Sequence, residues 1–162
     1  MTRTIRTYIL CLMAFLIVGV GISWTTVLQS FVRFYNNEGT LFKIQNCLFP
    51  NPVTTPCFYG AIAFLICLVW AIYLYRALDR ENISGSYIKL MWLLFASTIF
   101  GWVNVGYELY QFSQSPKGIV GCTSKVITSP WQSPCIYGSI MFLLSLIAVY
   151  TVVQKFKNKR DY

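Results

Sequence analysis

The segments TPCFYG at positions 55–60 and SPCIYG at positions 133–138 each open a long apolar run. Both contain a hydroxyl residue, Pro and Cys, followed after one further residue by Tyr-Gly. An offset of 78 residues superposes them, and the same offset places Phe64 on Phe142 and Leu68 on Leu146. The sequence therefore predicts a tandem repeat with one cysteine-bearing helix start in each half.

The composition of the chain is typical of a membrane protein. Of the 162 residues, 56% are hydrophobic, 17% are aromatic and only 11% are charged, and the mean hydropathy is +0.57. A helix that rises about 1.5 Å per residue needs roughly 18 to 20 apolar residues to cross a hydrocarbon core. Lipid offers backbone groups no water to bond, and the apolar runs lack the alternation of barrel strands, so we expect transmembrane helices. Four stretches qualify: 8–28, 58–75, 88–109 and 136–153.

The repeat divides these stretches into two hairpins, residues 1–80 and residues 81–162, with outer loops at 29–57 and 110–135. We therefore expect an all-α membrane protein, a four-transmembrane-helix bundle built from a tandem duplication of a helical hairpin. Small residues recur on one face of each expected helix, which lets backbones approach closely in lipid. In the first and third helices these are Gly19, Ser23, Ser97 and Gly101, and in the second and fourth they are Gly60, Cys67, Gly138 and Ser145.

The basic residues predict the orientation of the bundle. Nine of the thirteen Lys and Arg residues flank the two termini or lie between the second and third expected helices. By the positive-inside tendency, both termini are cytoplasmic and the two cysteine-bearing loops are extracytoplasmic. The net charge of +8 would also fit a nucleic-acid-binding protein, but the charges flank the helices and form no stripe. We therefore expect contact with the lipid bilayer and no nucleic acid partner.

Four of the six cysteines fall in the outer loops, two in each loop, namely Cys47, Cys57, Cys122 and Cys135. An extracytoplasmic compartment is oxidising, so disulfides are expected there. The repeat favours the pairs Cys47–Cys57 and Cys122–Cys135, and symmetric pairs between the loops remain open. Nine and twelve residues separate the members of each pair. Zinc ligands usually come about two to four residues apart, so we expect no metal site.

Two of these cysteines are placed for reactivity as well as for a structural bridge. Thr55 and Ser133 suit the helix N-cap, and the prolines that follow them suit the first helical position. This places Cys57 and Cys135 in the first turn, where free backbone amides and the helix dipole favour a thiolate. The same placement serves an inert staple equally well.

Four spans with cytoplasmic termini and a cysteine pair in each of two outer loops resemble the bacterial disulfide-bond-forming membrane oxidases. The run CTSKVITSP at 122–130 is also similar to a loop of vitamin K epoxide reductase relatives, which share that bundle. In those families one cysteine pair exchanges disulfides with a partner protein and passes electrons through the other pair to a quinone. This chain departs from them because it has no Cys-x-x-Cys pair, and no Arg follows Cys57 or Cys135 in the first turn.

The resemblance implies roles for particular residues. Cys57 and Cys135 would be the helix-start thiols, with Cys47 and Cys122 as their resolving partners. A quinone cofactor would lie between the helix tops, near Tyr59, Tyr137 and Glu108. Independently of the resemblance, Glu108 is the only acidic residue close to the interior of a span, where it either reaches interfacial water or is functional.

Two functions of different class remain open. The first is a membrane thiol-disulfide oxidoreductase, which the duplicated Pro-Cys site favours. The second is a non-catalytic membrane scaffold or partner-binding subunit with structural disulfides, whose outer loops bind an extracytoplasmic protein. The wide cysteine spacing and the absence of His favour the second function. The sequence leaves the oligomeric state open.

Overall fold

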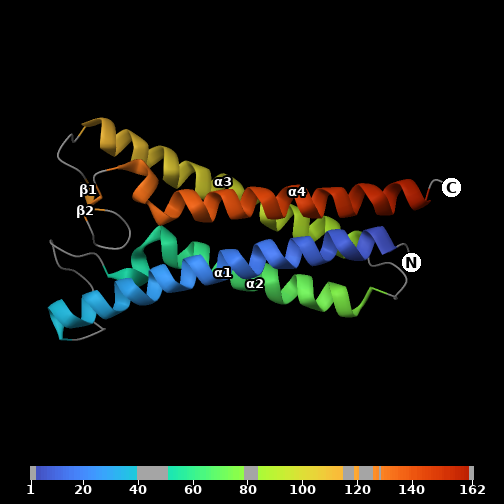
Figure 1. The fold of residues 1–162 in the computed structure, drawn as a ribbon, viewed down its shortest axis with the longest axis horizontal. Helices are drawn as coiled ribbons and strands as arrows, with labels where there is room; N and C mark the ends of the chain where they lie inside the picture. The colour runs from blue at the N-terminus through green and yellow to red at the C-terminus, as the bar shows by residue number, and fades with distance from the viewer. Residues whose placement is uncertain are drawn as a thin grey trace.

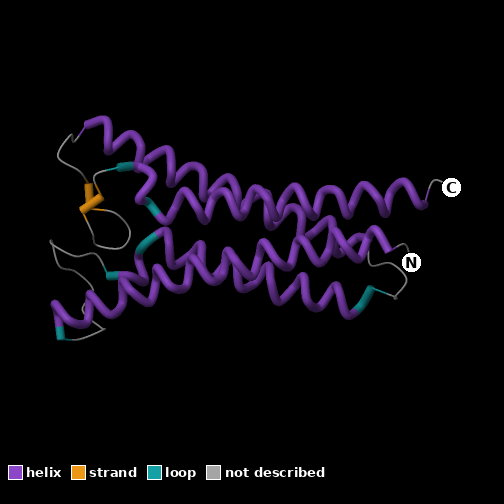
Figure 2. Tube along the Cα trace, in the orientation of Figure 1, coloured by secondary structure: helices purple, strands orange, loops and turns teal. Residues whose placement is uncertain are grey.

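The computed structural model of this chain describes residues 3–39, 51–78, 84–114, 119–120, 126–127 and 129–160. Four long helices dominate it (Figures 1 and 2). They are α1 (Arg3–Glu38), α2 (Pro56–Arg76), α3 (Ser84–Gln114) and α4 (Pro134–Arg160). Short 3-10 helices, η1 (Pro52–Thr54) and η2 (Pro130–Gln132), precede α2 and α4, and two-residue strands β1 (Ile119–Val120) and β2 (Val126–Ile127) pair antiparallel.

The helices form an antiparallel bundle, which confirms the expected all-α four-helix architecture. Helix α1 packs against α2 and α4, and α3 packs against α4 and α2. Both termini lie at one end of the bundle, and β1 and β2 lie at the other, where the α1–α2 and α3–α4 pairs diverge (Figure 1). We call these the terminal end and the strand end. Helices α2 and α4 both begin at the strand end.

Each helix is long and apolar enough to cross a membrane. Between 28% and 33% of the residues in the most apolar stretch of each helix are buried, and every helix also carries exposed large apolar side chains. The helices are longer than expected, and residues 29–38, predicted as loop, belong to α1. Helix α1 continues past its apolar run because this part of it also packs. Phe34 is buried, and the ring centroids of Phe31 and Phe58 lie 6.2 Å apart. Gly39, with φ of +68°, then ends α1 by donating its N–H to the Tyr35 carbonyl.

The starts of α2 and α4 are built alike. Each follows a 3-10 turn and one extended residue, Thr55 or Ser133, and each has Pro as its first helical residue. Pro fits this position because its fixed φ suits the helix and no amide hydrogen is needed there. This agrees with the expected helix starts and places Cys57 and Cys135 in the first turn of their helices.

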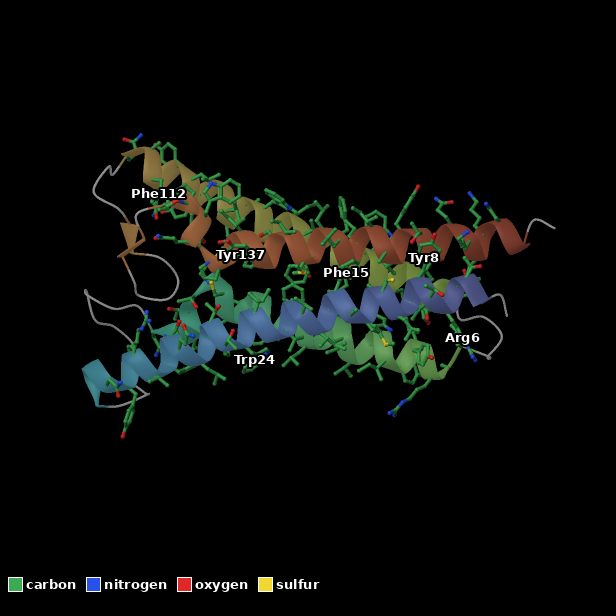
Figure 3. All side chains as sticks on the ribbon, in the orientation of Figure 1. Arg6, Tyr8, Phe15, Trp24, Phe112 and Tyr137 are labelled. Atoms are coloured by element: carbon green, nitrogen blue, oxygen red, sulfur yellow. The ribbon has the colours of Figure 1, made fainter. Side chains whose placement is uncertain are left out.

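The core lies between the middle of the bundle and its terminal end. On the side toward the strand end, the core is bounded by the stack of Phe64 on Phe142, with ring centroids 3.6 Å apart and an interplanar angle of 8°. Between the stack and the terminal end, buried side chains from all four helices fill the bundle, including Leu16, Leu74, Leu90 and Val149. Near the terminal end, the Lys155 ammonium lies 5.6 Å from the ring of Tyr8, which Figure 3 labels on α1.

The expected packing of small residues is confirmed in part. A Cβ on Gly19 would lie 2.3 Å from the Phe64 ring, and one on Gly101 would lie 2.7 Å from the Ser139 hydroxyl oxygen, so both glycines permit close helix contacts. Cys67 and Ser145 are fully buried. Gly60 and Gly138 contradict the prediction, because a Cβ on either would meet nothing within 4 Å. They border open space between the helices.

Candidate functional site

The starts of α2 and α4 bring two cysteines from different hairpins together. The sulfur atoms of Cys57 and Cys135 lie 3.3 Å apart, and both side chains are half-buried. A disulfide bond is about 2.05 Å long, so these sulfur atoms are in contact but are not bonded to each other. The two residues are 78 positions apart, and their contact crosses the centre of the bundle.

This contact is of the kind that the repeat left open, a pairing between the outer segments. The expected bridges Cys47–Cys57 and Cys122–Cys135 stay predictions, because Cys47 and Cys122 lie outside the described residues. The repeat favoured pairing within each loop. The structure places the two helix-start cysteines within reach of each other because α2 and α4 lie diagonally across the bundle.

Cys57 and Cys135 line a cavity of about 60 Å³. The Phe64–Phe142 stack contributes to its lining, and the other lining residues come in pairs related by the same offset of 78 positions. These pairs are Ile22 with Phe100, Ser23 with Gly101, Thr26 with Asn104, Pro56 with Pro134, Cys57 with Cys135, and Gly60 with Gly138. Ser139 also lines it, where the first half has Ala61. The cavity is therefore shared evenly by the two halves of the chain.

The polar side chains around the cavity bond to their own helices. Ser23 Oγ donates to the Gly19 carbonyl at 2.8 Å, and Thr26 Oγ1 donates to the Ile22 carbonyl at 2.9 Å. Ser139 Oγ donates to the carbonyl of Cys135, also at 2.8 Å. Each hydroxyl oxygen keeps acceptor capacity for a small polar molecule. A water needs roughly 10 to 15 Å³ of such space, so the cavity has room for a few waters.

The residues predicted to hold a quinone lie around this site without lining the cavity. Tyr59 and Tyr137 are 55% and 46% exposed, and the Tyr137 hydroxyl donates to the Trp131 carbonyl at 3.1 Å. Figure 3 shows Tyr137 near the start of α4. The cavity, at about 60 Å³, is smaller than one that binds benzene, which measures about 150 Å³. A quinone contact at Tyr59, Tyr137 and Glu108 stays a prediction.

Glu108 is hydrogen-bonded to Ser133, the residue before α4. Its Oε2 accepts a hydrogen bond from Ser133 Oγ, and Ser133 Oγ accepts one from the Cys135 N–H at 3.3 Å. Ser133 therefore acts as the expected N-cap and also links a carboxylate to the first turn of α4. Thr55 differs, because its hydroxyl donates to the Pro52 carbonyl at 2.6 Å and makes no capping bond with α2.

Sequence reasoning identified the cysteines, the helix starts and Glu108, and it missed the cavity. The signal was present in the offset of 78 positions. Residues such as Thr26 and Asn104 correspond in the two halves and lie on the helix faces expected to pack. What was missing was the divergence of the two hairpins at the strand end, which opens space between those faces.

No protein-family model, curated protein or solved structure matches this chain.

Proposed function

We propose that this chain is a multi-pass membrane protein that carries out thiol-disulfide exchange through Cys57 and Cys135. The observation that carries the proposal is the 3.3 Å separation of their sulfur atoms, which begin helices of different hairpins. Exchange requires that one sulfur can reach the next. These two sulfur atoms form a disulfide bond after an approach of just over 1 Å.

The surface of the bundle supports insertion in a bilayer. Large apolar side chains such as Val69, Val103 and Trp92 are 62% to 64% exposed on the described helices. Water would penalise such a surface along all four helices, whereas lipid does not. The described basic residues at the terminal end, among them Arg6 and Lys155, support cytoplasmic termini and an extracytoplasmic strand end.

A tandem duplication of a helical hairpin accounts for the arrangement of the site. Residues facing the centre from α2 meet the residues 78 positions later on α4, as Phe64 meets Phe142 and Cys57 meets Cys135. Duplication of one hairpin with one helix-start cysteine would thus create a pair of facing sulfur atoms. An oxidising compartment at the strand end would then give that pair a disulfide to exchange.

The reaction balances without a further cofactor. In the reduced protein, one of the two thiolates attacks the disulfide of an extracytoplasmic partner, forms a mixed disulfide and displaces one partner thiolate. The second cysteine then attacks the sulfur of the first, forms the Cys57–Cys135 bond and displaces the second partner thiolate. One partner disulfide is reduced, two thiols of this chain are oxidised, and their two protons pass to the partner. The reverse sequence oxidises a partner dithiol.

The test uses the full chain in lipid nanodiscs, reduced with dithiothreitol and then freed of it. Glutathione disulfide is added as the probe, and peptide mapping without reductant follows the bond. We expect a Cys57–Cys135 disulfide, two released glutathione molecules per chain, and a return to thiols on adding reduced glutathione. Cys57→Ser and Cys135→Ser should each stop at a mixed disulfide. A Cys57–Cys135 bond that never exchanges, or thiols that stay inert, would overturn the proposal. Either result would favour the alternative, a non-catalytic membrane scaffold or partner-binding subunit.

A further inference from the structure

The cavity that Cys57 and Cys135 line is a place where one small molecule meets both cysteines at once. The Phe64–Phe142 stack closes it on the side toward the core. With about 60 Å³ it holds a molecule of about two or three heavy atoms, because one water needs roughly 10 to 15 Å³ of such space. A peptide or a glutathione molecule is far larger, so the cavity selects by size.

The walls of the cavity suit a neutral molecule that carries hydroxyl hydrogens. The residues that line it in the described part of the chain carry no charge, and most present apolar surface. Ser23, Thr26 and Ser139 each donate the hydroxyl hydrogen to a carbonyl of their own helix at 2.8 to 2.9 Å. Each of these hydroxyl oxygens can therefore accept a hydrogen bond from a bound molecule. An ion would lose its hydration in this space without a charged partner.

The chemistry of two adjacent thiols narrows the choice of molecule further. Two thiols give up two electrons when they form a disulfide, so a small reactant beside them is an oxidant that accepts two electrons. Hydrogen peroxide has two oxygen atoms, two hydroxyl hydrogens and no charge. Oxidation of a thiolate gives a sulfenic acid, which condenses with a neighbouring thiol to a disulfide. The sulfur atoms of Cys57 and Cys135, 3.3 Å apart, are placed for both steps.

We infer that the cavity admits hydrogen peroxide and that the cysteine pair reduces it to water. This inference rests on the proposed exchange function and names the oxidant that returns the pair to the disulfide. Oxidation of a partner dithiol leaves Cys57 and Cys135 as thiols, and peroxide in the cavity then restores their bond. Either cysteine can react first, because both line the cavity.

The reaction balances with peroxide as the only added reactant. The sulfur of one thiolate attacks a peroxide oxygen, an S–O bond forms, the O–O bond breaks, and the leaving hydroxide takes the proton of the other thiol. That second sulfur attacks the sulfenic sulfur, the S–S bond forms and the S–O bond breaks. The hydroxide that leaves takes up the proton that the first thiol released. Two thiols and one peroxide thus give one disulfide and two waters.

The first test measures this reaction on the full chain in lipid nanodiscs, reduced with dithiothreitol and then freed of it. Hydrogen peroxide is added, acid stops the reaction, N-ethylmaleimide blocks the remaining thiols, and peptide mapping without reductant follows the Cys57–Cys135 bond. We expect one peroxide consumed for each bond formed. Cys135→Ser should stop at a sulfenic acid on Cys57, which dimedone captures. A bond that fails to form with peroxide would overturn the inference.

The second test asks whether peroxide reacts from within the cavity. Gly60 and Gly138 line it three residues after each cysteine, on the same helix face, and a Cβ on either meets nothing within 4 Å. The double variant Gly60→Ala, Gly138→Ala therefore keeps the fold and fills part of the space. It should slow bond formation by peroxide about fivefold or more. Gly106→Ala is the matched control, because Gly106 is equally open but does not line the cavity, and its rate should be unchanged.

A larger oxidant gives an independent measure of size selection. Tertiary-butyl hydroperoxide has the same O–O bond but exceeds the cavity, so it should form the Cys57–Cys135 bond about tenfold or more slowly than hydrogen peroxide. The ratio is corrected by the ratio of the same two oxidants with free glutathione. Equal rates in the double variant and Gly106→Ala, or no preference for the smaller oxidant, would overturn the inference.

These outcomes are separate from those that test the exchange function. If glutathione disulfide yields an exchangeable Cys57–Cys135 bond while peroxide shows no dependence on the cavity, the exchange function stands and the peroxide inference is wrong. If peroxide forms the bond through the cavity while glutathione never exchanges with it, the pair reduces peroxide and the exchange function is wrong. The double variant should keep the unaltered rate with glutathione disulfide, which is too large to enter the cavity.

Discussion

Adding one methyl group at two glycines tests the packing that holds the site open. In Gly19→Ala the new Cβ would lie 2.3, 2.7 and 2.8 Å from three atoms of the Phe64 ring. The ring is 1% exposed and stacked on Phe142 at 3.6 Å, so the only open space beside it is the small cavity that it lines. Overpacking of this kind typically costs about 1 to 3 kcal/mol. In Gly60→Ala the new Cβ meets nothing within 4 Å.

The two variants form a matched pair because each replaces a helical glycine by alanine. Both gain about 0.5 to 1 kcal/mol from the lower backbone entropy of alanine, so their difference in unfolding free energy isolates the overpacking cost of about 1 to 3 kcal/mol. Titration with dodecyl sulfate in mixed micelles, followed by circular dichroism, measures that difference. Gly60→Ala should be at least as stable as the unaltered protein. Equal stability of the two variants, or a lower stability for Gly60→Ala, would refute the placement of Phe64 against α1 and of Gly60 beside the cavity.

Two further predictions use the same unfolding measurement. Ser133→Ala removes the acceptor for the first turn of α4 and should cost about 1 kcal/mol, whereas Thr55→Ala should cost less because the Thr55 hydroxyl bonds to Pro52 and not to α2; equal costs would contradict the difference between the two caps. Phe142→Ala removes half of the central ring stack and should cost about 3 to 5 kcal/mol, with Phe142→Leu losing clearly less; a cost below about 1 kcal/mol for Phe142→Ala would contradict the stack.

Much of the fold follows from apolar length and from turn chemistry. A stretch of about 20 apolar residues predicts a helix because lipid satisfies no backbone group, and Pro after Thr55 or Ser133 predicts where α2 and α4 begin. The far ends of helices were harder to predict. Helix α1 continues to Glu38 past its apolar run, because Phe34 finds a buried place against neighbouring elements that hydropathy alone does not reveal.

The candidate site was predicted residue by residue but not as an arrangement. The first-turn cysteines were placed by local rules, since each follows a cap residue and Pro. Their contact with each other depends on α2 and α4 lying on one diagonal of the bundle, which is a property of tertiary packing. Gly60 and Gly138 were misassigned for the same reason, because small residues on a helix face fit either a close contact or a cavity wall, and the divergence of the hairpins decides between them.

The two halves of the chain place matching residues opposite each other at the centre of the bundle. Side chains that face the centre from α2 and α4 meet their counterparts, so any chemistry at the centre begins with two like groups, here Cys57 and Cys135. Two identical thiols in identical surroundings have no preferred order of reaction. Their surroundings are not identical, because Ser133 Oγ bonds to the Glu108 carboxylate and to the Cys135 N–H, whereas the Thr55 hydroxyl bonds to the Pro52 carbonyl. If the pair exchanges disulfides as proposed, the positions where the halves differ, and not the motif that they share, therefore set the order in which the two sulfur atoms react.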